Sequence, residues 1–265
     1  MLSKPRSISL HVKSDYKNAT RCLISSQIGH QVKPFVSLDV VKASELSATD
    51  SLTVADAGTA VIIFLMSGTA DFSDSTHKHG SLQENDVLWI LAGSGVHYSL
   101  RPTTEDCMMV KLRIALSPAL ECAPAQTACI NAMLVEQDGP ARVLLGQCDN
   151  ARSQLALPAL INYLVVNLTS GQSWIYEPSV NHPIAWVAVI HGEVKTSDRL
   201  VTSGEVIVYE RSNRAIVFSA QQDSIFLLGT SQEYMYDLAV EKYPTSSVIE
   251  TVELSQFEAS ALVCN

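Results

Sequence analysis

Hydrophobic and polar residues alternate along many short stretches of the chain. In the stretch 7–14, Ile8, Leu10 and Val12 alternate with polar residues, and the stretch 108–116 shows the same pattern. A period of two places successive side chains on opposite faces, which is typical of a β-strand with one buried face. Further strands are predicted at 60–66, 86–91, 142–145, 163–168, 184–190, 205–209, 215–218 and 224–228. Turn residues separate these stretches, so the pattern predicts an all-β sandwich or barrel.

Two segments of the chain resemble one another. The stretch AVIIFLMSG ends at Gly68, and the stretch AWVAVIHG ends at Gly192. Each is followed by a second apolar stretch, which contains Val87 in the first copy and Val206 in the second. A repeat of this kind predicts two β-barrels in tandem.

A segment without strand alternation separates the two copies. Residues 117–129 are rich in Ala and Pro, and we interpret them as a linker. This interpretation predicts an N-terminal barrel at residues 1–125 and a C-terminal barrel at residues 126–265. The clearest helical periodicity in the chain is at 253–263, which predicts a short C-terminal helix.

Composition and charge narrow the possible partners. The chain has 265 residues, 47% of them hydrophobic, with 18 basic residues and a formal net charge of −9. The basic residues form no run, and binding to a phosphate backbone needs clustered Lys and Arg, so we expect no direct contact with nucleic acid. No apolar stretch is long enough for a signal peptide or a membrane span. We therefore expect a cytoplasmic protein that does not bind a membrane. Its six cysteines show no C-x-x-C spacing and are expected to be free thiols.

Several segments resemble the pirin family of the cupin superfamily. The most specific is the segment 64–95, in which Asp74, Gly80, Trp89 and Gly93 fall at positions that match the family. The segment VKPFVSLDVV resembles a family segment that has an acid where this chain has Lys33. Further on, the segments RVLLGQ, FLLGTSQE and VELSQFEAS resemble the second barrel and the terminal helix.

The resemblance implies a fold and a chemistry. The fold is a pair of jelly-roll-like cupin barrels. Intact members hold one metal in the N-terminal barrel through three His and one Glu. Enzymatic members are quercetin dioxygenases, and eukaryotic members act as nuclear transcription cofactors. Imidazole and carboxylate ligands with open coordination positions suit Fe or another divalent transition metal that activates dioxygen.

The first two ligand positions of the family are changed in this chain. Counting back from Gly68, the family's segment His-Pro-His falls on Val54, Ala55 and Asp56. Val54 has no donor atom, and Asp56 offers carboxylate oxygens. Both imidazoles of this segment are therefore missing.

The other two ligand positions can be read in two registers. Without a gap, Tyr98 takes the place of the family's His and Leu100 the place of its Glu, and His97 then faces the opposite side of the strand. With a deletion of one residue in the preceding loop, His97 takes the ligand place and Ser99 stands where the family has Glu. The residues alone leave both registers open.

The metal site therefore looks degenerate. In either register it offers at most Asp56 and His97, so we expect no resident metal, with one Fe or other divalent transition metal as the alternative. The catalytic residues stay unknown, because the sequence shows no nucleophile elbow, phosphate-binding loop or zinc-binding helix. The degenerate positions are instead expected to line a ligand pocket, and they are Val54, Asp56, His97, Tyr98, Ser99 and Leu100.

Two other features carry an expectation. His77 and His79 form the only H-x-H in the chain, and we interpret them as exposed residues at a hairpin tip. Trp89 is expected to fill the barrel as a core residue.

These observations predict a pirin-like protein with two cupin barrels that is a non-catalytic small-molecule-binding or regulatory protein. Its expected partner is a small apolar or aromatic molecule. Two alternatives stay open, and with them the question of whether the protein is an enzyme. One is a quercetin dioxygenase whose metal is held by Asp56, His97 and a further ligand. The other is a platform that binds a protein partner.

Overall fold

The computed structural model describes residues 6–14, 16–17, 20–45, 50–157, 159–179, 181–238 and 246–251. Within these residues the structure is almost entirely β, with one short α-helix, α1 (Ser26–Gly29), and the turns η1 (Ala43–Glu45) and η2 (Ala132–Leu134). None of the helical segments in this part of the chain is long and apolar enough to cross a membrane. The all-β prediction is confirmed, whereas the helix predicted at 253–263 lies outside the described residues.

The chain divides into two compact units. The N-terminal unit comprises Tyr16–Thr20, Pro34–Ala132 and Met235–Asn265. The C-terminal unit comprises Met1–Asp15, Arg21–Lys33 and Met133–Tyr234. Between β1 (Ile8–Lys13) and β4 (Phe35–Lys42) the chain also forms the short strands β2 (Tyr16–Lys17) and β3 (Thr20–Ile24).

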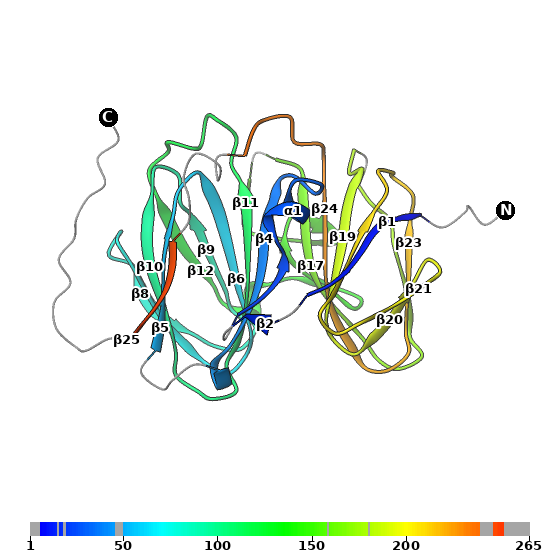
Figure 1. Ribbon diagram of the computed structural model, residues 1–265, viewed down its shortest axis with the longest axis horizontal. Helices are drawn as coiled ribbons and strands as arrows, with labels where there is room; N and C mark the ends of the chain where they lie inside the picture. Colours follow the sequence, from blue (N-terminus) through cyan, green and yellow to red (C-terminus); the bar gives the residue numbers. More distant parts are fainter. Residues whose placement is uncertain are drawn as a thin grey trace. The chain divides into compact units, whose positions relative to one another are not determined.

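The N-terminal unit contains two antiparallel sheets that face one another (Figure 1). One sheet includes, in spatial order, β12 (Gln126–Ile130), β9 (Val87–Leu91), β6 (Thr59–Ser67), β11 (Met108–Ala115) and β4 (Phe35–Lys42). The other sheet has the order β25 (Ser246–Thr251), β5 (Asp50–Asp56), β10 (Val96–Pro102), β7 (Ala70–Asp74) and β8 (His79–Leu82).

The C-terminal unit has the same construction (Figure 1). Its larger sheet has the order β1 (Ile8–Lys13), β22 (Glu205–Tyr209), β19 (Ile184–His191), β24 (Ser224–Ser231), β17 (Ile161–Leu168), β14 (Ala141–Leu145) and β13 (Gln137–Asp138). Its smaller sheet has the order β18 (Ser173–Tyr176), β23 (Ile216–Ala220), β20 (Glu193–Thr196) and β21 (Arg199–Thr202). A separate hairpin joins β15 (Gln147–Cys148) and β16 (Ala151–Arg152).

The strand orders show that the two units are copies of one topology. The order β9-β6-β11-β4 corresponds to β22-β19-β24-β17, and the order β5-β10-β7-β8 corresponds to β18-β23-β20-β21. The repeat in the sequence was recognised at Gly68 and Gly192. The hairpins at these glycines follow the equivalent strands β6 and β19. Both units are therefore barrels of the same kind.

The two units are not the continuous segments 1–125 and 126–265 that the sequence predicts. Strand β1 pairs with β22, so the N-terminal strand belongs to the C-terminal unit, and β12 pairs with β9 in the N-terminal unit. The period-two pattern reveals which face of a strand is buried but not which strand it pairs with. Pairing an added strand with β9 and with β22 satisfies backbone groups that an edge strand would leave open.

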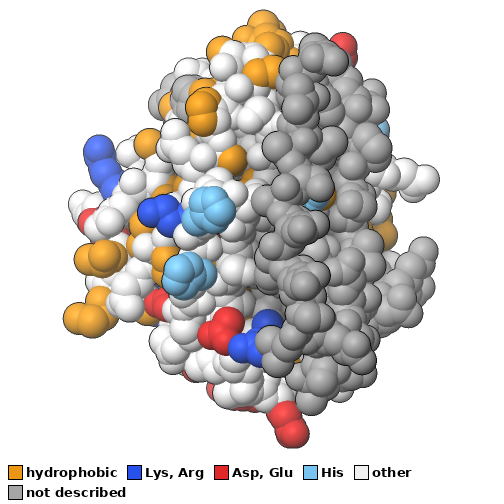
Figure 2. All heavy atoms as spheres, turned by 90° about the vertical axis from the view of Figure 1, so that its left-hand side faces the viewer, with side chains coloured by type: hydrophobic (Ala, Val, Ile, Leu, Met, Phe, Trp, Pro, Cys, Tyr) orange, Lys and Arg blue, Asp and Glu red, His pale blue; other side chains and the backbone are white. Residues whose placement is uncertain are grey.

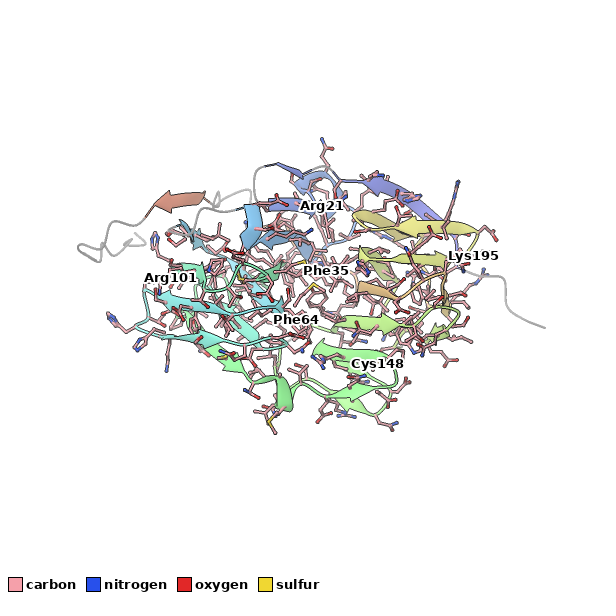
Figure 3. All side chains as sticks on the ribbon, turned by 90° about the horizontal axis from the view of Figure 1, so that it is seen from below. Arg21, Phe35, Phe64, Arg101, Cys148 and Lys195 are labelled. Carbon is pink, nitrogen blue, oxygen red and sulfur yellow. The ribbon has the colours of Figure 1, made fainter. Side chains whose placement is uncertain are left out.

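Each barrel is filled by side chains from both of its sheets (Figure 3). In the N-terminal unit, Leu88 and Ile90 of β9 point into the interior cluster. Trp89 is buried, with 8% of its surface exposed, but it is not part of that cluster. The expectation that Trp89 fills the barrel was therefore wrong about the face, because alternation along β9 directs its ring to the other side of the sheet.

The Gly192 turn leads to a testable prediction about stability. Gly192 has φ +84°, and a Cβ there would lie 2.3 Å from the backbone oxygen of Asp223. Gly171 has a similar φ of +78°, but no atom of the described residues lies within 4 Å of its added Cβ. Gly171→Ala should cost about 1–2 kcal/mol for the left-handed backbone alone. Gly192→Ala should cost about 1–3 kcal/mol more because the backbone must move. Urea unfolding of the two variants measures the difference, and equal midpoints would contradict it.

Candidate functional site

Strands β5 and β10 bring four of the expected pocket residues together in the N-terminal unit. The two strands pair antiparallel, with Tyr98 opposite Val54 and Val96 opposite Asp56. Residues opposite one another in a sheet share a face, and so do residues two apart along a strand. Val54, Asp56, Tyr98 and Leu100 therefore point to the same side, and each is at most 3% exposed. This side faces the interior of the barrel.

The remaining two expected residues point the other way. His97 is exposed and Ser99 is half-buried on the outer face of β10. The backbone of His97 is held by Ser75, whose Oγ accepts a hydrogen bond from the His97 N–H at 3.1 Å. The structure thus has the register without a gap, because burial of Tyr98 and Leu100 fixes the orientation of the whole strand.

The histidines of the hairpin tip also lie at the surface. His77 lies in the turn between β7 and β8, His79 begins β8, and both are exposed as expected. Figure 2 shows histidine side chains at the surface of this side of the molecule, next to basic side chains. The Oδ1 of Asp74 shapes the turn by accepting hydrogen bonds from the backbone N–H groups of Thr76 and Lys78.

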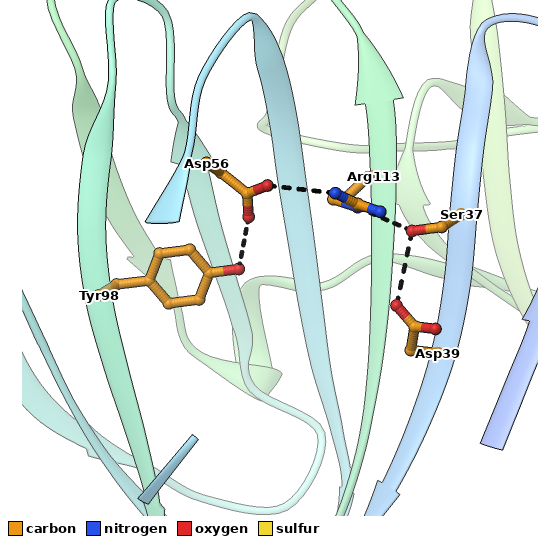
Figure 4. Close-up of polar contacts among 5 residues, drawn as sticks. All are labelled: Ser37, Asp39, Asp56, Tyr98 and Arg113. Carbon is orange, nitrogen blue, oxygen red and sulfur yellow. Dashed lines mark hydrogen bonds and ion pairs between the residues drawn. The ribbon is translucent and has the colours of Figure 1, made fainter. Parts of the chain in front are cut away.

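A buried polar network occupies the interior face at β5 and β10 (Figure 4). The hydroxyl of Tyr98 donates a hydrogen bond to Oδ2 of Asp56 at 2.8 Å. The other oxygen of Asp56, Oδ1, forms an ion pair with Nη1 of Arg113 at 3.5 Å. The Asp56 side chain is completely buried, and that of Arg113 is 15% exposed. Both carboxylate oxygens of Asp56 are thus engaged by neighbouring side chains.

The network continues onto the neighbouring strands β11 and β4 of the other sheet. Arg113 donates from Nε to Oγ of Ser37 at 2.8 Å, and Ser37 in turn donates to Oδ2 of Asp39 at 3.5 Å (Figure 4). The buried Lys111 lies directly opposite Asp39 on the neighbouring strand. Two basic and two acidic side chains therefore lie together, so the network contains balancing charges of both signs.

Burial controls the protonation of Tyr98. Loss of hydration raises the pKa of its hydroxyl well above the ordinary value, and the negative charge of Asp56 with its hydrogen bond raises the pKa further. Both effects disfavour the phenolate. Tyr98 therefore stays protonated at neutral pH and acts as a hydrogen-bond donor to Asp56.

The residues at these positions do not fit a divalent metal. Val54 and Leu100 have no donor atom, and Asp56 already balances a guanidinium. Within the described part of the chain, no three His, Cys, Asp or Glu side chains gather in a way that could hold a metal ion. A stable site for such an ion needs several imidazole or carboxylate ligands directed at one point and oriented by their neighbours.

Sequence reasoning did not single out Arg113, Ser37 or Asp39. The alternation along 108–116 placed Lys111 and Arg113 on the polar face of a half-buried strand. In the structure, Arg113 lies opposite Val61, and Lys111 lies opposite Ile63, on the interior face. Both faces of β11 are largely buried, so the polar side is the interior of the barrel. Two cations on one face of an otherwise apolar strand were the signal for this network.

Comparison with solved structures identifies the fold. A quercetin 2,3-dioxygenase from Acinetobacter baumannii superposes with a TM-score of 0.75 at 19% identity, covering 86% of this chain and 87% of the other. The bacterial pirin YhhW from Escherichia coli, solved in complex with nickel(II), superposes with a TM-score of 0.63 at 12% identity, covering 86% and 98%. Identities this low show the fold alone, and the fold is that of a cupin protein with two barrels.

A comparison with family models finds a match for part of the chain. Residues 16–114 match the family model described as Pirin. The matched residues include Asp56, Tyr98 and Arg113, and the resemblance to the pirin family seen in the sequence is confirmed for this part of the chain. No curated protein matches the chain at a significant level.

Proposed function

We propose that this protein is a pirin-like protein that works by binding a ligand, without metal-dependent oxygenation. The network around Asp56 carries the proposal. Its carboxylate is the only donor group among the four inward-facing positions that suits a divalent metal well, and Tyr98 and Arg113 engage both of its oxygens. Recruiting Asp56 to a metal would separate it from Arg113 and leave that guanidinium without its partner.

The similarity to a quercetin dioxygenase supports the fold and not the reaction. Oxygenase chemistry in cupin proteins depends on particular side chains, and one fold carries many functions. In this chain, Val54 and Leu100 occupy positions where the resemblance implies ligands. The exposed His97 is on the wrong face to replace them.

The proposed ligand is a small apolar or aromatic molecule. Val54, Val96 and Leu100 supply an apolar lining in the interior cluster, and Tyr98 and Arg113 supply polar groups beside it. Apolar walls with a few convergent polar groups are typical of small-molecule sites. A regulatory role for such binding, and the cytoplasmic location expected from the sequence, stay predictions.

One experiment tests both parts of this proposal. Protein purified without chelators is incubated with Fe(II), Mn(II) or Ni(II), dialysed, and analysed for metal. Oxygen uptake and thermal stability are then measured with quercetin as an aromatic probe. We expect much less than one metal per chain and a saturable thermal shift without oxygen uptake. One metal per chain, with uptake that Asp56→Ala abolishes, would restore the dioxygenase. If quercetin causes no thermal shift and no oxygen uptake, this result contradicts the binding role for aromatic ligands.

A variant that restores the ligands is the matched control. The combined changes Val54→His, Asp56→His, Tyr98→His and Leu100→Glu place three imidazoles and one carboxylate on the same interior face. We expect this variant to gain about one divalent metal per chain. A second variant combines Val54→His and Asp56→His with Ser99→Glu and keeps the native His97. It should show no such gain, because His97 and Ser99 face outward.

A further inference from the structure

The C-terminal unit contains a buried arginine that pairs with no carboxylate of the described residues. Arg6 lies just before β1 and is 1% exposed. Its Nε donates a hydrogen bond to the backbone oxygen of Glu210 at 2.9 Å, and its Nη2 donates to the backbone oxygen of Pro183. The guanidinium carbon lies 5.7 Å from the ring centre of Tyr209. Two backbone oxygens and one aromatic ring therefore fix the orientation of this side chain.

The third nitrogen of Arg6, Nη1, is buried without a hydrogen-bond partner among the described residues. Among the residues that the structure describes, none accepts a hydrogen bond from the buried Nη1, and no carboxylate forms an ion pair with Arg6. Burial lowers the pKa of Arg6 to about 10, so the group is still a cation at neutral pH. A buried charge with an unsatisfied donor is unfavourable unless an opposite charge accompanies it.

The nearby tyrosines do not supply that negative charge. Tyr209 shares a hydrogen bond of 2.6 Å with the hydroxyl of Thr196, and Tyr176 lies within electrostatic range of Arg6. Burial raises the pKa of both tyrosines, so both are neutral at physiological pH. These hydroxyls are neutral polar groups beside the cation.

A chain of hydrogen bonds joins Asn162, Tyr176, Thr230 and His182. Asn162 accepts through Oδ1 from the backbone N–H of Gln147, so its Nδ2 donates to the hydroxyl of Tyr176. The hydroxyls of Tyr176 and Thr230 share a hydrogen bond of 2.9 Å, and the hydroxyl of Thr230 shares another of 3.0 Å with Nδ1 of His182. Burial lowers the pKa of His182, which favours the neutral ring.

The chain of hydrogen bonds and Arg6 belong to one cluster. His182 precedes Pro183, whose carbonyl oxygen holds Arg6. Tyr176 and Tyr209 both belong to the interior cluster of this barrel. Among the described residues, the cluster therefore contains one positive charge without a counter-charge, surrounded by neutral polar groups and aromatic rings.

We propose that the C-terminal barrel binds a small organic carboxylate, with Arg6 as its anchor. One buried cation balances one negative charge, which fits a monocarboxylate better than the two charges of a phosphate. The planar guanidinium also matches the geometry of a carboxylate. The site is in the C-terminal unit, so it does not depend on the function proposed for the N-terminal barrel.

Benzoate is the probe for this site. Benzamide has the same shape without the charge, and phosphate has charge without the planar carboxylate. Isothermal titration and thermal unfolding of the full chain are measured with each compound. We expect saturable binding and a raised Tm with benzoate only. No saturable response to benzoate, or an equal response to benzamide or phosphate, would overturn the proposal.

Replacing the anchor separates a binding role from a structural one. Arg6→Met should weaken benzoate binding by about 10- to 100-fold, the range for a charged hydrogen bond. Its Tm without benzoate should be equal to or higher than that of the native protein, because the variant no longer buries a charge. The matched control is Arg214→Met, which removes an exposed arginine of the same unit and should leave benzoate binding unchanged.

A purely structural Arg6 gives a different result. In that case, Arg6→Met lowers the Tm by the same amount with and without benzoate, and this result overturns the proposal. If Arg6→Met fails to fold, Arg6→Lys is used in its place. Lysine keeps the charge and loses the planar fork, so benzoate should bind more weakly than to the native protein and still better than benzamide. If Arg6→Lys no longer prefers benzoate to benzamide while the native protein still does, the charge at this position is not sufficient for binding and the planar fork is required.

Discussion

Asp56→Ala is expected to lower the free energy of unfolding by about 3 kcal/mol. The substitution leaves the Arg113 guanidinium, whose side chain is 15% exposed, without the carboxylate that lies 3.5 Å away. It also removes the acceptor of the buried Tyr98 hydroxyl. Removing one partner of a buried ion pair is more harmful than removing both, because the remaining charge stays desolvated. Urea unfolding followed by circular dichroism measures the change.

The control for this prediction is Tyr98→Phe. It removes only the hydroxyl that donates to Asp56 and keeps the ring in the interior cluster. A hydrogen bond to a charged group contributes about 1.5–3 kcal/mol, so the effect of Tyr98→Phe should be smaller than that of Asp56→Ala. If the two variants lose equal stability, the pairing of Asp56 with Arg113 contributes nothing measurable. The double variant Asp56→Ala with Arg113→Met should recover part of the loss, since the opposite charges of Asp56 and Arg113 are then removed together.

Trp89→Ala is the second large effect, with an expected loss of about 3–5 kcal/mol. Trp89 is 8% exposed and lies opposite Ile62 and Ala128 on the neighbouring strands. The change removes a large buried aromatic surface, and the sheet cannot close around the space that is left. The expected size does not depend on which face of β9 carries the ring, because both faces of that strand are buried.

The matched control replaces two exposed residues of the same unit. His77→Ala together with His79→Ala should change stability by no more than about 0.5 kcal/mol, because both side chains face solvent. Thermal unfolding of the two proteins gives the comparison. Similar Tm values for the Trp89 variant and the double histidine variant would show that Trp89 is not buried in the folded protein.

The strands were readable from the sequence because alternation is a local property. The stretches predicted at 60–66, 163–168 and 184–190 correspond to β6, β17 and β19. The internal repeat also indicated the correct architecture, since the hairpins at Gly68 and Gly192 occupy equivalent places in the two units. Partner choice was not readable: β1 pairs with β22, about 200 residues away in the chain.

The site followed the same division between local and tertiary information. The sequence identified the positions of Val54 and Asp56 from their distance to Gly68, and it limited the other two positions to two registers. Only the pairing of β5 with β10 decided between Tyr98 and His97, because burial of one face orients every residue of the strand.

The sequence by itself determined the β architecture and the repeat, and the absence of most of the family's metal ligands stays a prediction from it. The tertiary structure decided which side chains meet around Asp56, since Arg113 pairs with it from a strand 57 residues further along the chain. It also revealed the buried Arg6, whose partners Pro183 and Glu210 are supplied by the C-terminal unit. The physical reason is that a side chain's charge and type are local properties. Its burial and its partners depend on segments that meet only when the sheets are assembled.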